Sequence, residues 1–324
     1  MNENSNQINW SDRCWKEMLI YQRRREILPD TLDKLACWID LKPGLTVVDI
    51  GCGLGFLGYT FWPYFGQGGS YLGIDLSREL LCETARSAKK WAVGGHADFQ
   101  AGDAYQLPLA DSCADVVICQ TLMMHLEHPQ QALAEMIRVS RSGGLVVCLE
   151  PDNVATLMTL AYPSVPRFDI EARLLFAKVA LVCNKGRINR GQGDNSIGAN
   201  IPSMMKQLGL SDIGVRINDR VYYTEPPYEG DLQQFHLEWD RKKWLDDELC
   251  RVRIDRDEQD FAAGGGDPGE FERYRKLYDS IRATIQQQLN DGTFFQCGSG
   301  DFYICKGRKL DQNDQRQTQS VDQV

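Results

Sequence analysis

The stretch from Val47 to Gly55, VVDIGCGLG, constrains the fold of this chain more than any other part of the sequence. Apolar residues lead into an acid, and glycine then recurs at every second position. Glycine adopts backbone angles that a Cβ forbids, and it allows a ligand to approach the main chain closely. The pattern therefore predicts a buried strand that turns sharply into a helix, with a ligand-binding loop between them.

The residues that follow this loop alternate between strand and helix patterns. Strands are expected at 46–50, 71–74, 98–101, 114–119 and 145–150. Helices are expected at about 54–65, at 77–91, and from Pro129 to a stop at Gly143-Gly144. Continuous apolar runs are typical of strands that are buried on both faces. The order predicts an α/β fold with a parallel, doubly wound sheet, whose ligands bind at the carboxyl ends of the strands.

Two further acids follow short apolar runs at the ends of expected strands. Asp75 closes the run 71–74, and Asp103 comes shortly after the run 98–101 within Gly102-Asp103-Ala104. With the glycine loop, these acids resemble, in order and interval, the motifs of the class I S-adenosylmethionine-dependent methyltransferases. The resemblance covers about residues 40–150, and loosely 195–222.

The resemblance implies a Rossmann-like, doubly wound, seven-stranded sheet with an antiparallel last strand and helical cap insertions. It also implies S-adenosylmethionine as the cofactor. In such a site Asp75 accepts both ribose hydroxyls, and Leu76 packs on the adenine face. Asp103 accepts from the adenine amine, and the Ala104 amide donates to a ring nitrogen.

The same resemblance assigns the remaining parts of the cofactor. The glycines leave room for the methionine part, and Gln120 reaches the amino-acid end. The complete set of expected cofactor-binding residues is Asp49, Gly51, Cys52, Gly53, Gly55, Asp75, Leu76, Asp103, Ala104 and Gln120.

His125 is the first candidate for catalysis, because it follows the fourth strand at the edge where ligands bind. Its role stays open between a base, a contact to cofactor or substrate, and a structural residue. A base is needed only where the acceptor must lose a proton. His125 and His128 also form an H-x-x-H pair, but no third ligand can be named, so no metal is expected.

Three residues are candidates for a substrate contact or a lid. Glu150 ends the fifth strand at the same edge, although a turn residue before Pro151 needs no function. Tyr21 lies in an N-terminal helical segment that folds over the cofactor in many relatives, and helix packing explains it equally well. Tyr222 is one of several aromatic residues in the second half of the chain.

The chain is expected to consist of a core with two helical insertions that form a lid over a small or medium substrate. The predicted segments are 1–42 (N-terminal helical lid segment), 43–150 (cofactor-binding core), 151–200 (helical insertion), 201–222 (core continuation), 223–293 (helical cap insertion), 294–308 (last core strand) and 309–324 (disordered tail).

Within the second half, helices are expected at 165–184, 201–208, 231–262 and 269–290, a loop at 184–200, and strands at 212–222 and 302–306. The helix 165–184 should turn Phe168 inward. Ile213, Val215 and Ile217 alternate with polar residues or glycine, which predicts a half-buried strand.

The charge of the chain narrows the class of partner, and its cysteine usage indicates the cellular compartment. The chain has 36 Lys and Arg against 45 Asp and Glu, a net charge of −9, so nucleic acid is not an expected partner. No apolar run is long enough to span a membrane. Eleven cysteines occur without a C-x-x-C pair, and several lie in apolar runs, which fits a reducing cytoplasm. The sequence does not indicate an oligomeric state.

The expected activity is methyl transfer from S-adenosylmethionine to O, N or C of a small-molecule acceptor, which yields S-adenosylhomocysteine. One alternative is a non-catalytic module that binds S-adenosylmethionine. Another is an NAD(P)-dependent oxidoreductase, because Gly53 to Gly58 also satisfies G-x-G-x-x-G and Asp75 lies 22 residues beyond Gly53. Asp49 and the Asp103-Ala104 pair favour the methyltransferase, since NAD binding requires neither.

Overall fold

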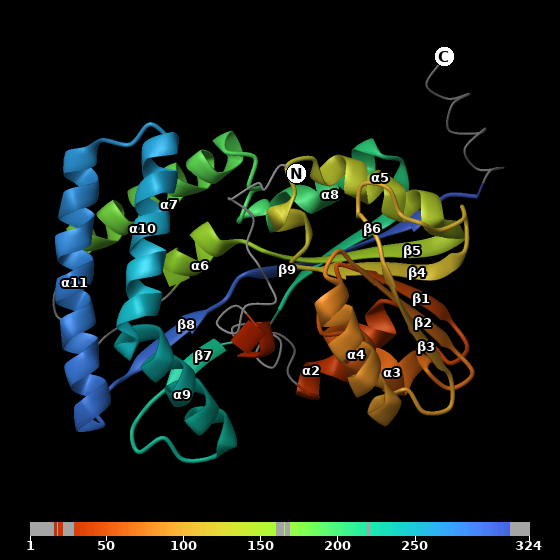
Figure 1. Cartoon of the computed structure of the whole chain (residues 1–324), viewed down its shortest axis with the longest axis horizontal. Coiled ribbons are helices and arrows are strands. Elements are labelled where there is room, and N and C mark those ends of the chain that lie inside the picture. The colour runs from red at the N-terminus through yellow and green to blue at the C-terminus, as the bar shows by residue number, and fades with distance from the viewer. Residues whose placement is uncertain are drawn as a thin grey trace. The chain divides into compact units, whose positions relative to one another are not determined.

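The computed structural model describes residues 16–17, 19–21, 29–159, 165, 169–218 and 221–311 (Figure 1). Residues 16–17 and 19–21 are helical. The rest of the N-terminal helical pattern before residue 29, the inward position of Phe168 and the tail beyond residue 311 lie outside the described residues.

The described chain forms two compact units. The first unit contains the described residues up to Glu150, together with Ile197–Asn218 and those from Phe302 onward. The second unit contains the described residues of Pro151–Ser196 and Asp219–Asp301. The first unit has two hydrophobic cores, and the second unit has one of its own. Across these residues, no helix is long and apolar enough to cross a membrane.

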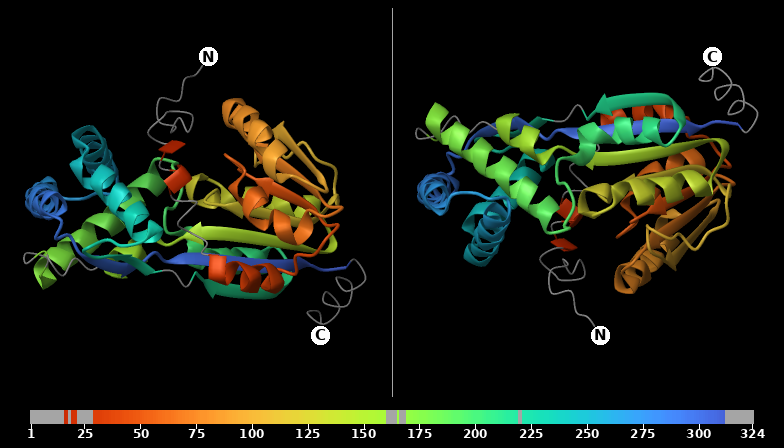
Figure 2. Two further views of the ribbon diagram at one scale, coloured as in Figure 1. Left: turned by 90° about the horizontal axis from the view of Figure 1, so that it is seen from below. Right: turned by 90° about the horizontal axis from the view of Figure 1, so that it is seen from above.

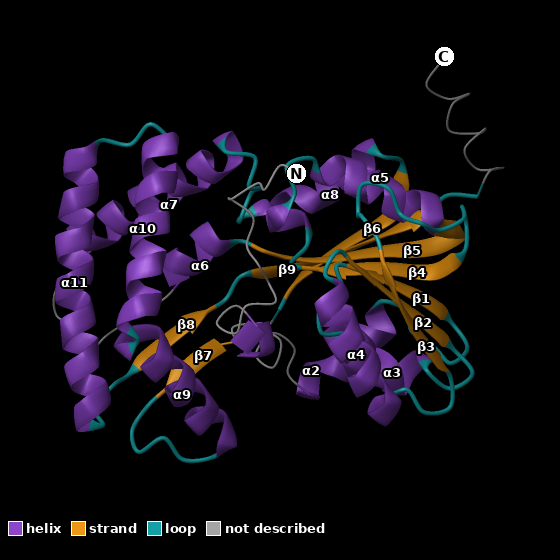
Figure 3. Ribbon diagram, in the orientation of Figure 1, coloured by secondary structure: helices purple, strands orange, loops and turns teal. Residues whose placement is uncertain are grey.

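A seven-stranded sheet in the order β3-β2-β1-β4-β5-β9-β6 forms the centre of the first unit (Figure 3). Its strands are β1 (Thr46–Ile50), β2 (Ser70–Asp75), β3 (His96–Ala101), β4 (Ala114–Gln120), β5 (Ser140–Pro151), β6 (Leu210–Ile217) and β9 (Phe302–Lys309). Strands β1 to β5 pair in parallel, and β6 pairs with β9 antiparallel. The predicted doubly wound sheet with an antiparallel last strand is therefore confirmed.

Helices cover both faces of this sheet (Figure 2). They are α2 (Pro29–Trp38), α3 (Phe56–Phe65), α4 (Arg78–Trp91), α5 (Pro129–Val139), α8 (Ile201–Gln207) and the 3-10 turns η1 (Met123–His125) and η2 (Ile197–Asn200). Successive strand residues point to opposite faces, so Val47 packs with Leu57 and Phe61 of α3, whereas Val48 belongs to the core formed with α5. This alternation gives the sheet two cores from one set of strands.

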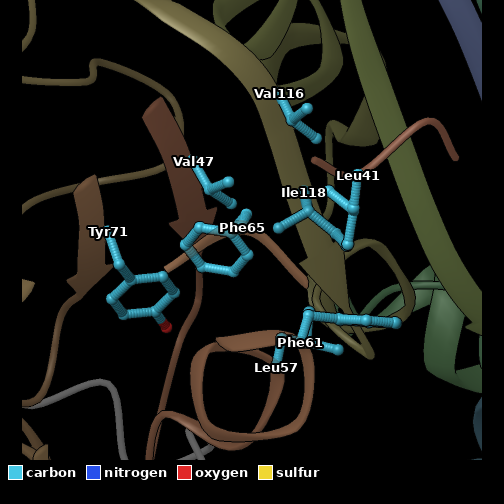
Figure 4. A pocket seen from close by; sticks show the side chains of 8 residues that line it. All are labelled: Leu41, Val47, Leu57, Phe61, Phe65, Tyr71, Val116 and Ile118. Carbon is cyan, nitrogen blue, oxygen red and sulfur yellow. The ribbon is translucent and has the colours of Figure 1, made fainter. Parts of the chain in front are cut away.

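A small void of about 10 Å³ lies in the core between the sheet and α3. Its lining side chains are all apolar or aromatic and point toward one another (Figure 4): Leu41, Val47, Leu57, Phe61, Phe65, Tyr71, Val116 and Ile118. A space of this size holds one water at most, so it is a packing gap rather than a ligand site.

The expected end of α5 was wrong. The helix ends at Val139, and β5 begins at Ser140 and runs through Gly143 and Gly144. Ser140 is extended and pairs with Ala114 of β4, with a register shift before Val116. The two glycines lie inside an irregular stretch of strand, because pairing with β4 outweighs their local tendency to form a turn.

The strand expected at 212–222 is in fact two strands in different sheets, β6 and β7 (Val221–Thr224). The predicted half-burial was also wrong, since Val215 and Ile217 are 45% and 51% exposed. Strand β6 is the last strand of its sheet, and the pairing with β9 shifts register between Ser211 and Gly214. An edge strand buries less of its surface than the period-2 pattern alone suggests.

The second unit combines five helices and a two-stranded sheet within its described residues. These elements are α6 (Asn153–Thr159), α7 (Ile170–Asn189), α9 (Asp231–Leu245), α10 (Asp247–Ala263), α11 (Pro268–Asp291) and the antiparallel pair β7 and β8 (Gln296–Ser299). The loop expected from 184 was wrong, because α7 continues to Asn189. The single helix expected over 231–262 divides at Asp246, whose side chain accepts from the Leu249 amide and caps α10.

Helices α7 and α10 approach each other closely at two glycines. A Cβ on Gly186 would lie 1.7 Å from the carbonyl oxygen of Asp260, and a Cβ on Gly264 would lie 2.1 Å from that of Val182. The side chain of Arg190 then reaches Asp260, at 2.7 Å between Nη1 and Oδ1. The absence of a Cβ at these two positions therefore sets the distance between the helices.

Candidate functional site

Strands β1 to β4 are parallel, so the segments that follow them meet at one edge of the sheet. The glycine loop after β1 turns directly toward β2. The amides of Gly51 and Cys52 both donate to the carbonyl oxygen of Ile74, at 2.8 and 3.0 Å. This places the loop beside Asp75, the last residue of β2.

The three loop glycines share a left-handed backbone but differ in their surroundings. Their φ angles are 70° at Gly51, 50° at Gly53 and 71° at Gly55. A Cβ would lie 3.0 Å from Leu122 Cδ1 at Gly51, and 2.4 Å from Thr84 Cγ2 at Gly55. At Gly53 a Cβ would meet nothing within 4 Å. Two glycines are therefore packed against side chains, and the middle one faces open space that can receive a ligand.

The carboxylate of Asp75 is held in a fixed orientation beside this space. Its Oδ2 accepts from the Gly53 amide and its Oδ1 from the Ser77 amide, both at 2.8 Å. Burial raises the pKa of Asp75 above the ordinary value of 3.8, and the amide hydrogen bonds oppose that change. Leu76, the next residue, is 71% exposed despite its apolar side chain. An oriented acid and an uncovered apolar surface thus lie side by side.

The loop after β3 carries Asp103 and Ala104. Asp103 is exposed, and its Oδ1 accepts from the Tyr105 amide at 2.9 Å, whereas Ala104 is buried. The position of this loop depends on two residues of α5. Arg138 donates to the carbonyl oxygens of Leu107 and Leu109, and the carboxylate of Glu135 accepts from the Leu107 amide.

Glu135 and Arg138 are residues that sequence reasoning missed. They also bind each other, with Arg138 Nε 2.7 Å from Glu135 Oε1, and this pairing lowers the pKa of Glu135. In the sequence they read as an ordinary i,i+3 pair on a helix surface. Nothing in the local sequence pattern indicates that Glu135 and Arg138 hold the loop after β3, about thirty residues earlier in the chain.

The side chains of Asp49 and Cys52, which were expected at the cofactor site, are both buried. Asp49 is 1% exposed, and its Oδ2 accepts from the Tyr71 hydroxyl at 2.6 Å. Cys52 is buried beneath Gly73, and burial, followed by the charges of Asp49 and Asp75, raises the pKa of its thiol. Both side chains support the loop from the core side.

The segment after β4 contains Gln120, which is 3% exposed, and the turn η1 with His125. Thr121, between them, has a left-handed φ of 48°. His125 is half-buried, and its amide donates to the carbonyl oxygen of Leu122 at 3.0 Å. The candidate base therefore sits at the end of a short turn at the carboxyl edge.

Glu150 is not exposed to solvent, with a relative accessibility of 0%. It accepts from the amides of Leu122 and Met123, both at 2.9 Å, and of Met124 at 3.3 Å. Its carboxylate therefore faces the main chain of η1, and the expected substrate contact stays a prediction.

The remaining two candidates, Tyr222 and Tyr21, belong to different units. Tyr222 belongs to β7 of the second unit, where it is buried and packs edge-on against His236 with ring centroids 6.4 Å apart. Tyr21 is a buried residue of the helical segment 19–21. Within the described residues, no group of three or more His, Cys, Asp or Glu side chains is arranged to hold a metal ion.

Comparison with known proteins gives a family match over most of the first unit. The model of the methyltransferase domain family matches residues 41–208, which is more than half of the chain. A protein encoded in a Streptomyces fradiae transposon is 34% identical over 39% of this chain and 35% of its own length. A demethylmenaquinone methyltransferase of Desulfitobacterium hafniense is 29% identical over 45% of this chain and 54% of its own length.

The chain thus spans about half the length, or less, of these curated relatives. Among solved structures, a putative methyltransferase of Bacillus halodurans is similar to 87% of this chain and 100% of its own chain, with 16% identity and a TM-score of 0.49. The family match and the sheet order together confirm the resemblance seen in the sequence. The chain belongs to the methyltransferase domain family, of the class I S-adenosylmethionine-dependent type.

Proposed function

We propose that this protein transfers a methyl group from S-adenosylmethionine to O, N or C of a small-molecule acceptor and releases S-adenosylhomocysteine. The oriented carboxylate of Asp75 is the observation that carries this proposal. It lies beside the open space at Gly53 and the exposed Leu76. For a nucleoside, Asp75 can supply the hydrogen-bond acceptor of the ribose, Gly53 the open floor, and Leu76 the apolar face for the base. The family match supports the same reaction class.

The residues present fit this cofactor. Asp75 would hold the ribose hydroxyls, Leu76 would pack on the adenine, and Asp103 with the Ala104 amide would bind the adenine edge. When bound, S-adenosylmethionine supplies an electrophilic methyl group on its sulfonium. The chain then has to hold the acceptor in line with that methyl group and to exclude water, which is mainly a task of orientation.

The acceptor class and compartment are also proposals. A small molecule is favoured because the acidic chain, with a net charge of −9, does not attract a phosphate backbone. The relative from Desulfitobacterium hafniense is likewise named for a small-molecule acceptor. We place the protein in the cytoplasm, because buried cysteines such as Cys119, Cys148 and Cys305 are free thiols.

Calorimetric titration of the purified protein with S-adenosylhomocysteine, and separately with NADH, tests the proposal. Micromolar binding of S-adenosylhomocysteine, followed by its production from S-adenosylmethionine over an acceptor panel, is expected. Binding without production over any acceptor would support the non-catalytic module. Binding of NADH instead would return the G-x-G-x-x-G motif to the oxidoreductase interpretation.

The middle glycine of the loop should matter for binding more than for folding. In Gly53→Ala the new methyl group enters open space, and the left-handed backbone costs about 1–2 kcal/mol. We expect a folded protein whose affinity for S-adenosylhomocysteine falls at least about 10-fold, or about 1.4 kcal/mol.

Gly55→Ala is the matched comparison, because its Cβ would also strike Thr84. This variant should lose more stability, about 2–4 kcal/mol, since overpacking is added to the backbone strain. Thermal unfolding and calorimetry measure the two effects separately. If Gly53→Ala kept wild-type affinity, the space above Gly53 would not be the cofactor site.

His125 is proposed as the group that takes up a proton from the acceptor where one must be lost. His125→Ala should reduce formation of S-adenosylhomocysteine about 100-fold or more. Its affinity for S-adenosylhomocysteine should change less than about 3-fold, since general bases act in the chemical step. The exposed His128, substituted to alanine, is the control from the same segment. Equal losses of affinity and rate in His125→Ala would indicate a cofactor contact instead.

A further inference from the structure

Glu150 is a buried carboxylate that binds three consecutive main-chain amides of another segment. Oε1 accepts from Leu122 and Met123, and Oε2 accepts from Met124. The thiol of Cys119 lies 3.9 Å from Oε1. The end of β5 is therefore fastened to the segment that follows β4.

The three amides begin the turn η1, where the first N–H groups of a helix have no partner within the helix. A local Ser, Thr, Asp or Asn side chain often takes this role, but η1 has no side-chain cap of its own. Glu150 supplies the acceptor from 26 to 28 residues further along the chain. The conformation of η1 thus depends on a contact between Glu150, near the end of β5, and the segment that follows β4.

The fastened segment touches the cofactor loop directly. Leu122 lies over Gly51, so close that a Cβ there would be 3.0 Å from its Cδ1. Thr121, immediately before it, has a left-handed φ of 48°. A non-glycine residue in that region costs of order 1 kcal/mol and persists only where its surroundings hold it. Glu150 is the buried group that holds the next three residues.

We infer that Glu150 is a positioning residue: by holding the amides of residues 122–124 it keeps Leu122 against Gly51, and so fixes the shape of the glycine loop. The inference rests on the proposed function for its effect on the cofactor. It assigns to Glu150 no contact with the acceptor or the reacting atoms. The hydrogen bonds themselves are independent of which ligand the loop receives.

Glu150→Gln is the sharpest substitution, because it keeps the size of the side chain. A carboxamide offers one acceptor oxygen, and its NH₂ group would face at least one of the amide donors. Residues 122–124 should then open more often, and Leu122 should leave Gly51 more often. Leu122→Ala removes the side chain that packs over Gly51, which is the second contact on the path from Glu150 to the glycine loop. Glu127→Gln is the control, an exposed glutamate in the same segment.

The experiment combines amide hydrogen exchange of residues 121–125 with calorimetric titration by S-adenosylhomocysteine. In Glu150→Gln we expect exchange at residues 122–124 to rise at least about 10-fold and affinity to fall about 10-fold, with Glu127→Gln unchanged. Leu122→Ala should weaken binding to a similar extent. The double variant should lose little more than either single variant, because both substitutions break one path.

Losses that multiply to about 100-fold in the double variant would overturn the inference, since the two residues would then act independently. Unchanged exchange in Glu150→Gln would overturn it as well. Failure of the proposed function looks different: the wild-type protein would not bind S-adenosylhomocysteine. The exchange experiment needs no ligand, so in that case it still decides whether Glu150 holds the segment.

Discussion

Asp75→Ala should weaken binding of S-adenosylhomocysteine by about 100-fold or more, the largest effect on affinity that we expect from one side chain. Two hydrogen bonds from ribose hydroxyls to a carboxylate contribute about 1.5–3 kcal/mol each, and a loss of about 2.7 kcal/mol already corresponds to 100-fold. The substitution also removes the acceptor of the Gly53 and Ser77 amides, so the loop loses its anchor to β2. Calorimetric titration measures the affinity.

Asp98→Ala is the matched control. Asp98 belongs to the neighbouring strand β3, and its side chain is exposed and bound to His96. We expect this variant to bind S-adenosylhomocysteine with wild-type affinity. If both aspartate variants bound equally well, Asp75 would not be the ribose acceptor, and the proposed cofactor site would be wrong.

The pH dependence of binding should follow from the same carboxylate. Burial raises the pKa of Asp75 above 3.8, so in the free protein it takes up a proton at a higher pH than an exposed aspartate does. A protonated Asp75 accepts ribose hydroxyls less well. Affinity should therefore be constant at neutral pH and should decline as the pH is lowered through this raised pKa. In Asp75→Asn the decline should be absent.

Gly186→Ala should destabilise the second unit by about 3 kcal/mol or more. The direction of this stability change distinguishes a packing effect from helix propensity, because alanine in a helix interior is normally more stable than glycine by up to about 1 kcal/mol. Here the added Cβ would lie 1.7 Å from the carbonyl oxygen of Asp260, so α7 and α10 would have to separate. Their separation would also strain the ion pair between Arg190 and Asp260.

Gly269→Ala in α11 serves as the control for helix propensity. The nearest atom to its Cβ would be Asp267 Oδ1 at 3.1 Å, with no backbone atom of another helix nearby. This variant should be neutral or slightly more stable. Hydrogen exchange over α7 and α10 at increasing urea concentration reports on the second unit separately from the first. Unchanged protection in Gly186→Ala would mean that the two helices adapt without cost.

Much of the first unit was predictable because its signals are local. The glycines at 51, 53 and 55 have the left-handed φ that their spacing predicted. The helix expected to begin at residue 77 is also present, with Ser77 capping α4 by accepting from the Leu80 amide. The doubly wound sheet was also predicted, since alternating strands and helices leave few other ways to pack the chain.

Errors arose where a long-range contact outweighed a local preference. Gly143 and Gly144 suggest a turn, yet they lie in β5 because Ser140 before them and Leu145 after them pair with β4. The glycine at 186 suggests the end of a helix, yet α7 continues because that position packs against the backbone of α10. In both cases the partner segment is far away in the sequence and leaves no mark on the local pattern.

The sequence by itself determined the ligand loop, the acid at the end of β2 and the family, because backbone angles and strand ends depend on neighbouring residues. Only the tertiary structure decided what the acids do. Asp49 and Glu150 look alike as acids in or at the end of buried strands, but one binds Tyr71 in the core and the other holds η1. Their roles depend on hydrogen bonds across 22 and 28 residues, and such contacts exist only once the sheet has formed.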